Sequence, residues 1–322
     1  VEGDLMSVGI GLSESMYSTL TDELDIIINS AATVQFDERL DLALNLNTLG
    51  PQRLLALAKG CRKTPLFVHV STCYVAGKLT GVIPEEVLEQ EETVAHRLQG
   101  GNLPPFNVNE EVRSIFRFTR QVIHEANAPA TRPAIEAAAE ARRRRSIQSA
   151  EAPPSFEVAR DQWIRDRLVA EGMTRAQGHG WNDSYTFTKS LAEKLLVRHH
   201  GEVPLIVLRP SIIESSLHEP EPGWLEGYRM ADPMIAAYGL GRMSSFSSRR
   251  EVVLDIIPLD LTVNAIIAAT AYPPIEGRRV YQMASGTQNP LNLGEIADLM
   301  YEHFQEHPML DKQKKPIRVK PW

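Results

Sequence analysis

The sequence places a phenol and an ammonium group four residues apart, at Tyr185 and Lys189. In a helix this spacing puts both side chains on one face, one turn apart. A free tyrosine has a pKa of about 10, but a nearby positive charge favours the phenolate and lowers that pKa. The pair could therefore act as a general acid–base group. The spacing alone favours an ordinary alternative, a core aromatic beside a solvated lysine, because four-residue spacings are abundant in helices.

The residues around this pair predict a helix that can hold both groups. A polar residue at 182–184 could cap its start. Phe187, Leu191 and Leu195 occupy a different stripe, which is suited to packing.

Short apolar runs elsewhere read as strands, at residues 25–29, 66–70, 204–208 and 279–283. Uninterrupted apolar runs are typical of strands that are covered on both faces. A helical pattern at residues 38–59 separates the first two runs, and the phenol-bearing helix precedes the third. Strands that alternate with helices predict an α/β fold with a parallel sheet.

Small and polar residues follow three of these strands. Ser30, Thr72 and Pro210 all fall at carboxyl ends, and ligands of such sheets bind beyond those ends. Ala31 and Ala32 would let a ligand lie close to the backbone. We therefore expect the chemistry to gather at this edge.

A long insertion, residues 78–180, interrupts this pattern. Helical patterns cover residues 110–127, 132–149 and 156–171. So large an insertion is usually functional, as a lid or a substrate wall. Its four consecutive arginines at 142–145 read either as a solvated helix face or as a phosphate contact.

Composition limits the classes of function. The net charge of −7 gives no support for nucleic-acid binding. Cys61 and Cys73 are too few for a disulfide framework and lack metal-ligand spacing, so we expect a reducing compartment, the cytoplasm, and no bound metal. No apolar run is long enough to span a bilayer. Peripheral membrane contact and the oligomeric state stay open.

Beyond these patterns, several stretches taken together resemble the fatty acyl-CoA reductases of the male-sterility type, in the extended short-chain dehydrogenase/reductase superfamily. Besides Tyr185, Lys189 and Thr72, the resemblance is carried by residues 1–5, 29–34, 45–50, 69–72, 209–213, 219–224, 255–260 and 285–290. Each stretch alone is weak evidence for the family, but the order in which they occur together is specific. Together the stretches cover most of the chain outside the insertion.

The resemblance implies a Rossmann-like doubly wound parallel sheet. Residues 1–77 and 181–212 would form a partial NAD(P)-binding domain, 78–180 a helical insertion, and 213–322 a smaller substrate-binding region with a returning strand near 279–285. The family's glycine-rich turn would precede residue 1. We therefore expect the N-terminal β-α-β part, with the region that selects NADP over NAD, to be missing from this sequence.

The implied activity is NADPH-dependent reduction of a long-chain fatty acyl-CoA thioester to a fatty aldehyde and on to the alcohol. One alternative is a thioester-reductase domain that acts on carrier-protein-bound acyl chains. Another is a non-catalytic binding protein with the reductase fold. The joint presence of Tyr185, Lys189 and Thr72 argues against the last, because binding alone does not require them.

The resemblance also implies roles for single residues. Tyr185 would donate the proton, Lys189 would hold the nicotinamide ribose and lower the tyrosine pKa, and Thr72 would bond the reacting oxygen. Ser71 is the neighbouring alternative to Thr72. Asn47 matches the helix asparagine that organises a proton-relay water.

Further residues would contact the cofactor. Asp4 resembles the acidic residue that contacts the adenine ring, although it could simply be a turn aspartate. The other cofactor contacts would be Ser30, Ala31 and Ala32 through their backbone, Asn47, Tyr185 and Lys189, and Pro210, Ser211 and Ile212 along the nicotinamide.

Pro51 gives a physical reason to single out Asn47. It lies four residues later and has no N–H to donate to the Asn47 carbonyl. We therefore expect the helix to kink there and the free carbonyl to hold the relay water. A plain break at Gly50 and Pro51 without catalytic meaning is the alternative.

Five more residues have ordinary readings beside functional ones. Trp224, Tyr228 and Met230 could line an acyl channel or belong to the core. Cys73 has no paired histidine and is expected to be a small buried residue. His69, on an apolar strand, is expected to be a core histidine.

Overall fold

The computed structural model describes residues 1–100, 103–145, 154–228, 231–243, 245, 248–274 and 277–322. The chain divides into two units. The first contains residues 1–207 and 273–280, and the second contains residues 208–272 and 281–322. The domain limits given above stay a prediction.

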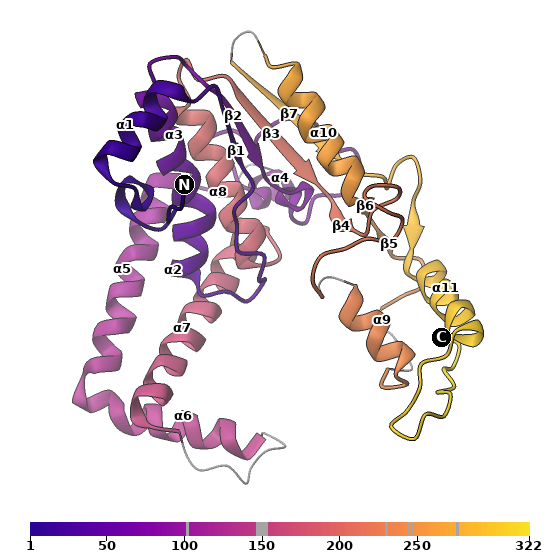
Figure 1. Cartoon of the computed structure of the whole chain (residues 1–322). Coiled ribbons are helices and arrows are strands. Elements are labelled where there is room, and N and C mark those ends of the chain that lie inside the picture. The colour runs from indigo at the N-terminus through magenta and orange to yellow at the C-terminus, as the bar shows by residue number, and fades with distance from the viewer. Residues whose placement is uncertain (101–102, 146–153, 229–230, 244, 246–247, 275–276) are drawn as a thin grey trace. The chain divides into compact units, whose positions relative to one another are not determined.

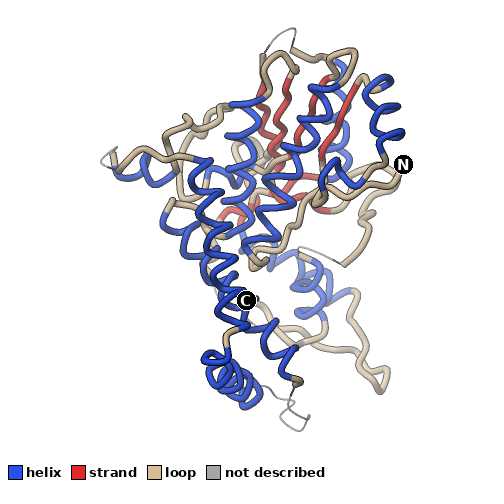
Figure 2. Tube along the Cα trace, turned by 90° about the vertical axis from the view of Figure 1, so that its left-hand side faces the viewer, coloured by secondary structure: helices blue, strands red, loops and turns tan. Residues whose placement is uncertain are grey.

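A four-stranded sheet has the order β1-β2-β3-β7 (Figure 1). Its strands are β1 (Ile26–Asn29), β2 (Leu66–Val70), β3 (Leu205–Pro210) and β7 (Arg278–Met283). All four predicted strands are therefore present, and Figure 2 shows them side by side in red. β1 pairs with β2 in parallel, from Ile26 opposite Leu66 to Asn29 opposite His69. The carboxyl ends of these two strands are neighbours, as predicted.

β1 differs from the expectation of a strand covered on both faces. Ile27 and Asn29 are buried, whereas Ile26 and Ile28 are 44% and 50% exposed. Burial therefore alternates along β1, which has one covered face and one open face, and α3 packs against this strand. β2 and β3 match the expectation, since nearly every residue in both is buried.

The helical pattern at residues 38–59 is divided into three parts. They are α2 (Leu40–Ala43), a π-helical segment η2 (Leu44–Leu49) and α3 (Gly50–Gly60). Leu55, Leu57 and Ala58 of α3 pack against Phe67 of β2, in the core of the first unit. Before β1 lie η1 (Val8–Gly11) and α1 (Glu14–Glu23), which the sequence analysis did not identify.

The helix that carries Tyr185 is α8 (Ser184–His199). Its N-cap is Asp183, whose carboxylate accepts the Thr186 N–H at 2.8 Å. Most of its residues are buried, so α8 is an interior helix. Its stripe of Phe187, Leu191 and Leu195 lies in a core cluster, as predicted.

The insertion is helical, as predicted, and belongs to the first unit. The short helix η3 (Cys73–Ala76) comes just before the insertion. The insertion itself contains α4 (Val94–Gln99), α5 (Val108–Asn127), η4 (Pro129–Thr131), α6 (Arg132–Arg145) and α7 (Phe156–Gly178). α5 and α7 run side by side (Figure 1) and share apolar contacts. α7 ends at Gly178, later than expected, and residues 146–149 of the predicted second helix lie outside the described residues.

The arginine run pairs with carboxylates of the insertion. Arg142 donates to both oxygens of Asp166, at 2.8 and 2.9 Å. Arg143 and Arg144 pair with Glu140. These contacts fit the reading as a solvated, ion-paired helix face, and the phosphate contact stays a prediction.

The described residues of the second unit form two small sheets and three helices. β4 (Ile212–Glu214) pairs in parallel with β6 (Ile256–Pro258), and β5 (Val253–Leu254) pairs antiparallel with β8 (Leu291–Asn292). The helices are α9 (Asp232–Gly239), α10 (Leu259–Ala271) and α11 (Leu293–Glu306). Across the described part of both units, no helix has the length and apolar character needed to cross a bilayer.

Candidate active site

Tyr185 meets Thr72 at the end of β2. The Tyr185 phenol and the Thr72 side chain share a hydrogen bond. Thr72 is held in place because its Oγ1 accepts the Tyr74 N–H at 3.2 Å, which caps η3. Two of the predicted catalytic side chains are therefore in direct contact, although they lie on separate elements.

The pKa of Tyr185 moves in the opposite direction to the expectation. Burial raises this pKa to about 12, and the bond with Thr72 opposes the rise only in part. Lys189 is not among the groups that shift it. The expectation that the lysine lowers the tyrosine pKa is therefore wrong for this structure, because desolvation disfavours the phenolate. The phenol keeps its proton throughout the neutral range, which suits a proton donor.

Lys189 is buried, with 2% of its surface exposed, so it is not the solvated lysine of the ordinary reading. Its Nζ donates to the Val70 carbonyl at 2.9 Å, at the last residue of β2. Burial lowers the pKa of Lys189 to about 8, and Glu193 opposes this shift. The side chain is therefore mostly cationic at pH 7.

Ser71 differs from Thr72 in its contacts. It is buried, and its Oγ has no hydrogen-bond partner among the residues that the structure describes. Thr72 is the one that bonds Tyr185. This geometry favours Thr72 over the alternative Ser71 at the reacting oxygen, while both roles stay predictions.

Asn47 lies fully buried in the π-helical segment. Its amide nitrogen donates to the Thr33 carbonyl at 3.1 Å and to Thr188 Oγ1 at 3.2 Å. Its Oδ1 accepts the Thr33 N–H at 2.9 Å. The side chain therefore ties the loop after β1 to helix α8.

The regular α-helix is interrupted around Asn47, as the proline suggested. The interruption is a π-helical turn, in which the Gly50 N–H bonds the Asn45 carbonyl. Gly50 and Pro51 do not form a loop but begin α3. Short π-helical segments are frequent at functional sites, and the relay water stays a prediction.

Asp4 has the geometry of a turn residue. Its carboxylate accepts the Met6 N–H at 2.9 Å and the Ser7 hydroxyl at 2.5 Å, and these bonds hold its pKa below the usual value. The adenine contact stays a prediction, as do the backbone contacts of residues 30–32, which follow β1 directly.

The remaining predicted cofactor residues belong to the second unit. Pro210 ends β3, the Ser211 N–H donates to the Met283 carbonyl, and the Ile212 N–H donates to the Asp255 carbonyl. These bonds fix the backbone of the segment within its own unit. Their role beside the nicotinamide stays a prediction.

The predicted acyl-channel residues are not core residues where they are described. Trp224 is 36% exposed and Tyr228 is 63% exposed. Met230 lies outside the described residues.

His69 is a core residue, as expected. Its Nδ1 lies 3.0 Å from the Asn29 amide nitrogen, while its Nε2 has no partner within the described part of the chain. Burial and the Lys189 charge hold the pKa of His69 well below its usual value. Cys73 is only half-buried.

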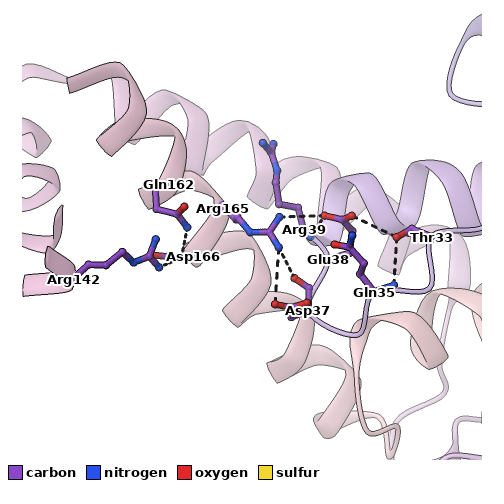
Figure 3. A network of polar contacts seen from close by, with 9 residues as sticks. All are labelled: Thr33, Gln35, Asp37, Glu38, Arg39, Arg142, Gln162, Arg165 and Asp166. Carbon is purple, nitrogen blue, oxygen red and sulfur yellow. Dashed lines mark hydrogen bonds and ion pairs between the residues drawn. The ribbon is translucent and has the colours of Figure 1, made fainter. Parts of the chain in front are cut away.

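Sequence reasoning missed a loop that reaches the phenol. The Phe36 ring contacts the Tyr185 ring edge-on, with centroids 6.0 Å apart and planes at 70°. Arg165 of α7 reaches the next two residues, Asp37 and Glu38 (Figure 3). One signal was present in the sequence, because this loop follows the carboxyl end of a predicted strand.

Comparisons with known proteins identify the family of this chain. The family model described as male sterility protein matches residues 1–266. Fatty acyl-CoA reductase 2, chloroplastic, from Arabidopsis thaliana is 35% identical over 99% of this chain and 47% of its own length. An alcohol-forming fatty acyl-CoA reductase from Simmondsia chinensis is 31% identical over 98% of this chain and 56% of its own length. The chain thus spans about half the length of these curated relatives.

A solved structure shows the same fold. The terminal R domain from the myxalamid PKS-NRPS biosynthetic pathway has a TM-score of 0.54 and 17% sequence identity, over 93% of this chain and 53% of that one. The fold is Rossmann-like α/β, as the sequence predicts. Since the family match contains the Tyr185, Lys189 and Thr72 constellation and covers most of the chain, the protein belongs to the male sterility protein family.

Proposed function

We propose that the protein uses NADPH to reduce a long-chain fatty acyl-CoA thioester to the aldehyde and on to the alcohol. The observation that supports this most is the hydrogen bond between Tyr185 and Thr72, with buried Lys189 one turn away. The names of the relatives, which are fatty acyl-CoA reductases, support the substrate class.

The residues fit a nicotinamide cofactor. Small residues at 30–32 follow the end of β1, and the buried Ser71 hydroxyl lacks a partner among the described residues. Lys189 donates one of its three N–H groups to Val70 and has others for a ribose hydroxyl. Bound NADPH would supply the hydride.

The chain's own side chains would manage the proton and the charge. Negative charge builds on the thioester oxygen as the carbonyl is reduced, and preorganised donors there lower the barrier by several kcal/mol. Tyr185 gives that oxygen a proton, and Thr72 holds it with a hydrogen bond. Collapse of the thiohemiacetal then breaks the carbon–sulfur bond, releases CoA as the thiol and leaves the aldehyde.

The Tyr185→Phe variant tests this proposal. Thiol release from a long-chain acyl-CoA is expected to fall by roughly 100-fold or more, because the proton donor is lost. The NADPH affinity of the full-length protein, from a fluorescence titration, is expected to stay mostly intact. Tyr272→Phe, at a site 76% exposed, is the control. A rate like that of the wild type in Tyr185→Phe would remove this residue from the mechanism.

A substrate comparison separates the acyl-CoA proposal from a carrier-bound substrate. Turnover of free long-chain acyl-CoA at a rate comparable to that of the same acyl group on a carrier protein supports the proposal. Turnover of the carrier-bound form alone contradicts it.

We place the protein in the cytoplasm, with peripheral contact to membranes into which such substrates partition, and cell fractionation tests this location.

A further inference from the structure

We infer that Phe36 forms a wall of the acyl-thioester site beside Tyr185, and that Arg165 of the insertion positions this wall. The inference rests on the proposed function and deepens it, because it names residues that select the acyl group. It assigns the insertion a part in substrate selection.

Phe36 lies where a substrate at the phenol would meet it. Its ring touches the edge of the Tyr185 ring, at a centroid distance of 6.0 Å. Phe36 is nevertheless 54% exposed as a residue, so it offers surface to a ligand. Ligand sites are lined mainly by apolar and aromatic side chains around a few polar groups. Here the polar groups are Tyr185 and Thr72, and Phe36 supplies apolar surface next to them.

The loop that carries Phe36 is fixed at its start. The Asn47 amide bonds both backbone groups of Thr33. Thr33 Oγ1 donates to Glu38 Oε2 at 3.4 Å, and the Glu38 N–H donates to the Gln35 carbonyl at 3.3 Å. These bonds close the loop around Phe36.

The other support comes from the insertion. Arg165 Nη1 donates to Glu38 Oε1 at 3.4 Å, and its Nη2 donates to the Asp37 carbonyl at 3.3 Å (Figure 3). The Glu38 side chain is only 14% exposed, so this contact is shielded from water in part. Arg165 therefore holds the two residues that follow Phe36, from a helix more than 100 positions away in sequence.

The next residue of α7 provides a matched control. Asp166 pairs with Arg142 of α6, and within the described part of the chain it forms no hydrogen bond or ion pair with residues 33–38 (Figure 3). Arg142→Ala breaks an ion pair of the same helix without touching residues 33–38. Arg165→Ala breaks the pair that reaches the loop.

The experiment measures kcat and KM for acyl-CoA substrates of short and long chains, in full-length protein. Phe36→Leu and Phe36→Ala are expected to lower kcat/KM for the long chain by about tenfold and to change the ratio of long-chain to short-chain kcat/KM. The NADPH affinity is expected to stay unchanged. Because Phe36 is largely exposed, these variants are expected to fold, which thermal unfolding checks.

A double variant tests the positioning role of Arg165. Arg165→Ala alone is expected to change the same ratio in the same direction, and Arg165→Lys to restore part of it. When Arg165→Ala is added to Phe36→Ala, it is expected to have little further effect on this ratio, since the effects of substitutions that act through one contact are not additive. Arg142→Ala is expected to leave the ratio unchanged.

Two outcomes overturn the inference in distinguishable ways. Wild-type turnover with an unchanged chain-length profile in Phe36→Leu and Phe36→Ala would overturn the inference alone. Wild-type protein that binds NADPH but releases no thiol from any acyl-CoA would overturn the proposed function, and the inference with it.

Discussion

Tyr185 and Lys189 lie one turn apart on α8, and burial moves their pKa values in opposite directions. Burial raises the pKa of the Tyr185 phenol to about 12 and lowers the pKa of the Lys189 ammonium to about 8. Both shifts favour the neutral form of the group, since a low-dielectric surrounding penalises charge. At pH 7 both groups still carry their protons, so the pair is ready to donate in the direction of reduction.

The pH profile of kcat/KM should report Lys189 first. Lysine is cationic below its pKa, so activity is expected to fall as the pH rises through about 8, well before Tyr185 loses its proton near 12. Lys189→Arg is expected to retain part of the activity and to move this fall to higher pH, because arginine stays charged. Steady-state rates between pH 6 and 10 measure both profiles. An alkaline fall that does not move in Lys189→Arg would contradict this assignment.

At the scale of elements, the π-helical segment η2 and the insertion helix α7 both pack against α8, the helix that carries Tyr185 and Lys189. The π-helical turn sets Asn47 between the Thr33 backbone and Thr188 of α8. The insertion contacts α8 through α7, and the ion pair between Arg175 of α7 and Glu111 of α5 is shielded in part from water. A change in either helix should therefore act on the site without touching a reactive group.

Pro51→Ala tests the π-helical turn. The new N–H could bond the Asn47 carbonyl and favour a regular α-helix, which would move the Asn47 side chain off its partners. We expect kcat to fall about tenfold or more while the protein stays folded, because the relay would be disturbed. Pro129→Ala, which removes a proline from the first turn of η4, is the control. An unchanged kcat in Pro51→Ala would separate the turn from catalysis.

Arg175→Met tests the junction between α5 and α7. Arg175 donates to Glu111 at 2.9 Å and to Glu171 at 2.7 Å, and its side chain is only 19% exposed. Its loss leaves two shielded carboxylates without their arginine partner, so the free energy of unfolding is expected to drop by about 2 kcal/mol. Arg142→Ala breaks a pair with both side chains about half exposed and should cost under ~0.5 kcal/mol. Urea unfolding compares them, and equal losses would contradict this reasoning.

For the molecule as a whole, cofactor choice is the property to test. The chain spans about half the length of its curated relatives, and the family match covers residues 1–266. We expect NADPH to raise the melting temperature of the full-length protein more than NADH does at the same concentration. A ligand at ~100 times its Kd adds about 2.7 kcal/mol to the stability. Tyr185→Phe should show the same shift, and equal shifts for the two nucleotides would contradict a preference for NADPH.

The sequence determined the parts that depend on local pattern. The apolar run at residues 66–70 predicts strand β2 with the same bounds as the structure, and the periodicity and cap residues predict helix α8. The four-residue spacing of Tyr185 and Lys189 predicted that both side chains lie one turn apart on one face of the helix. The ordered motifs gave the family. Each of these signals is contained in a short stretch of residues.

Only the tertiary structure decided how these parts meet. The π-helical form of η2, the one-sided cover of β1 and the raised pKa of Tyr185 all depend on what surrounds each residue. Arg165 and Glu38 are 127 residues apart in sequence, and their contact has no local signature. The physical reason is that burial and hydrogen bonding depend on distance in space, which a pattern of neighbours along the chain does not contain.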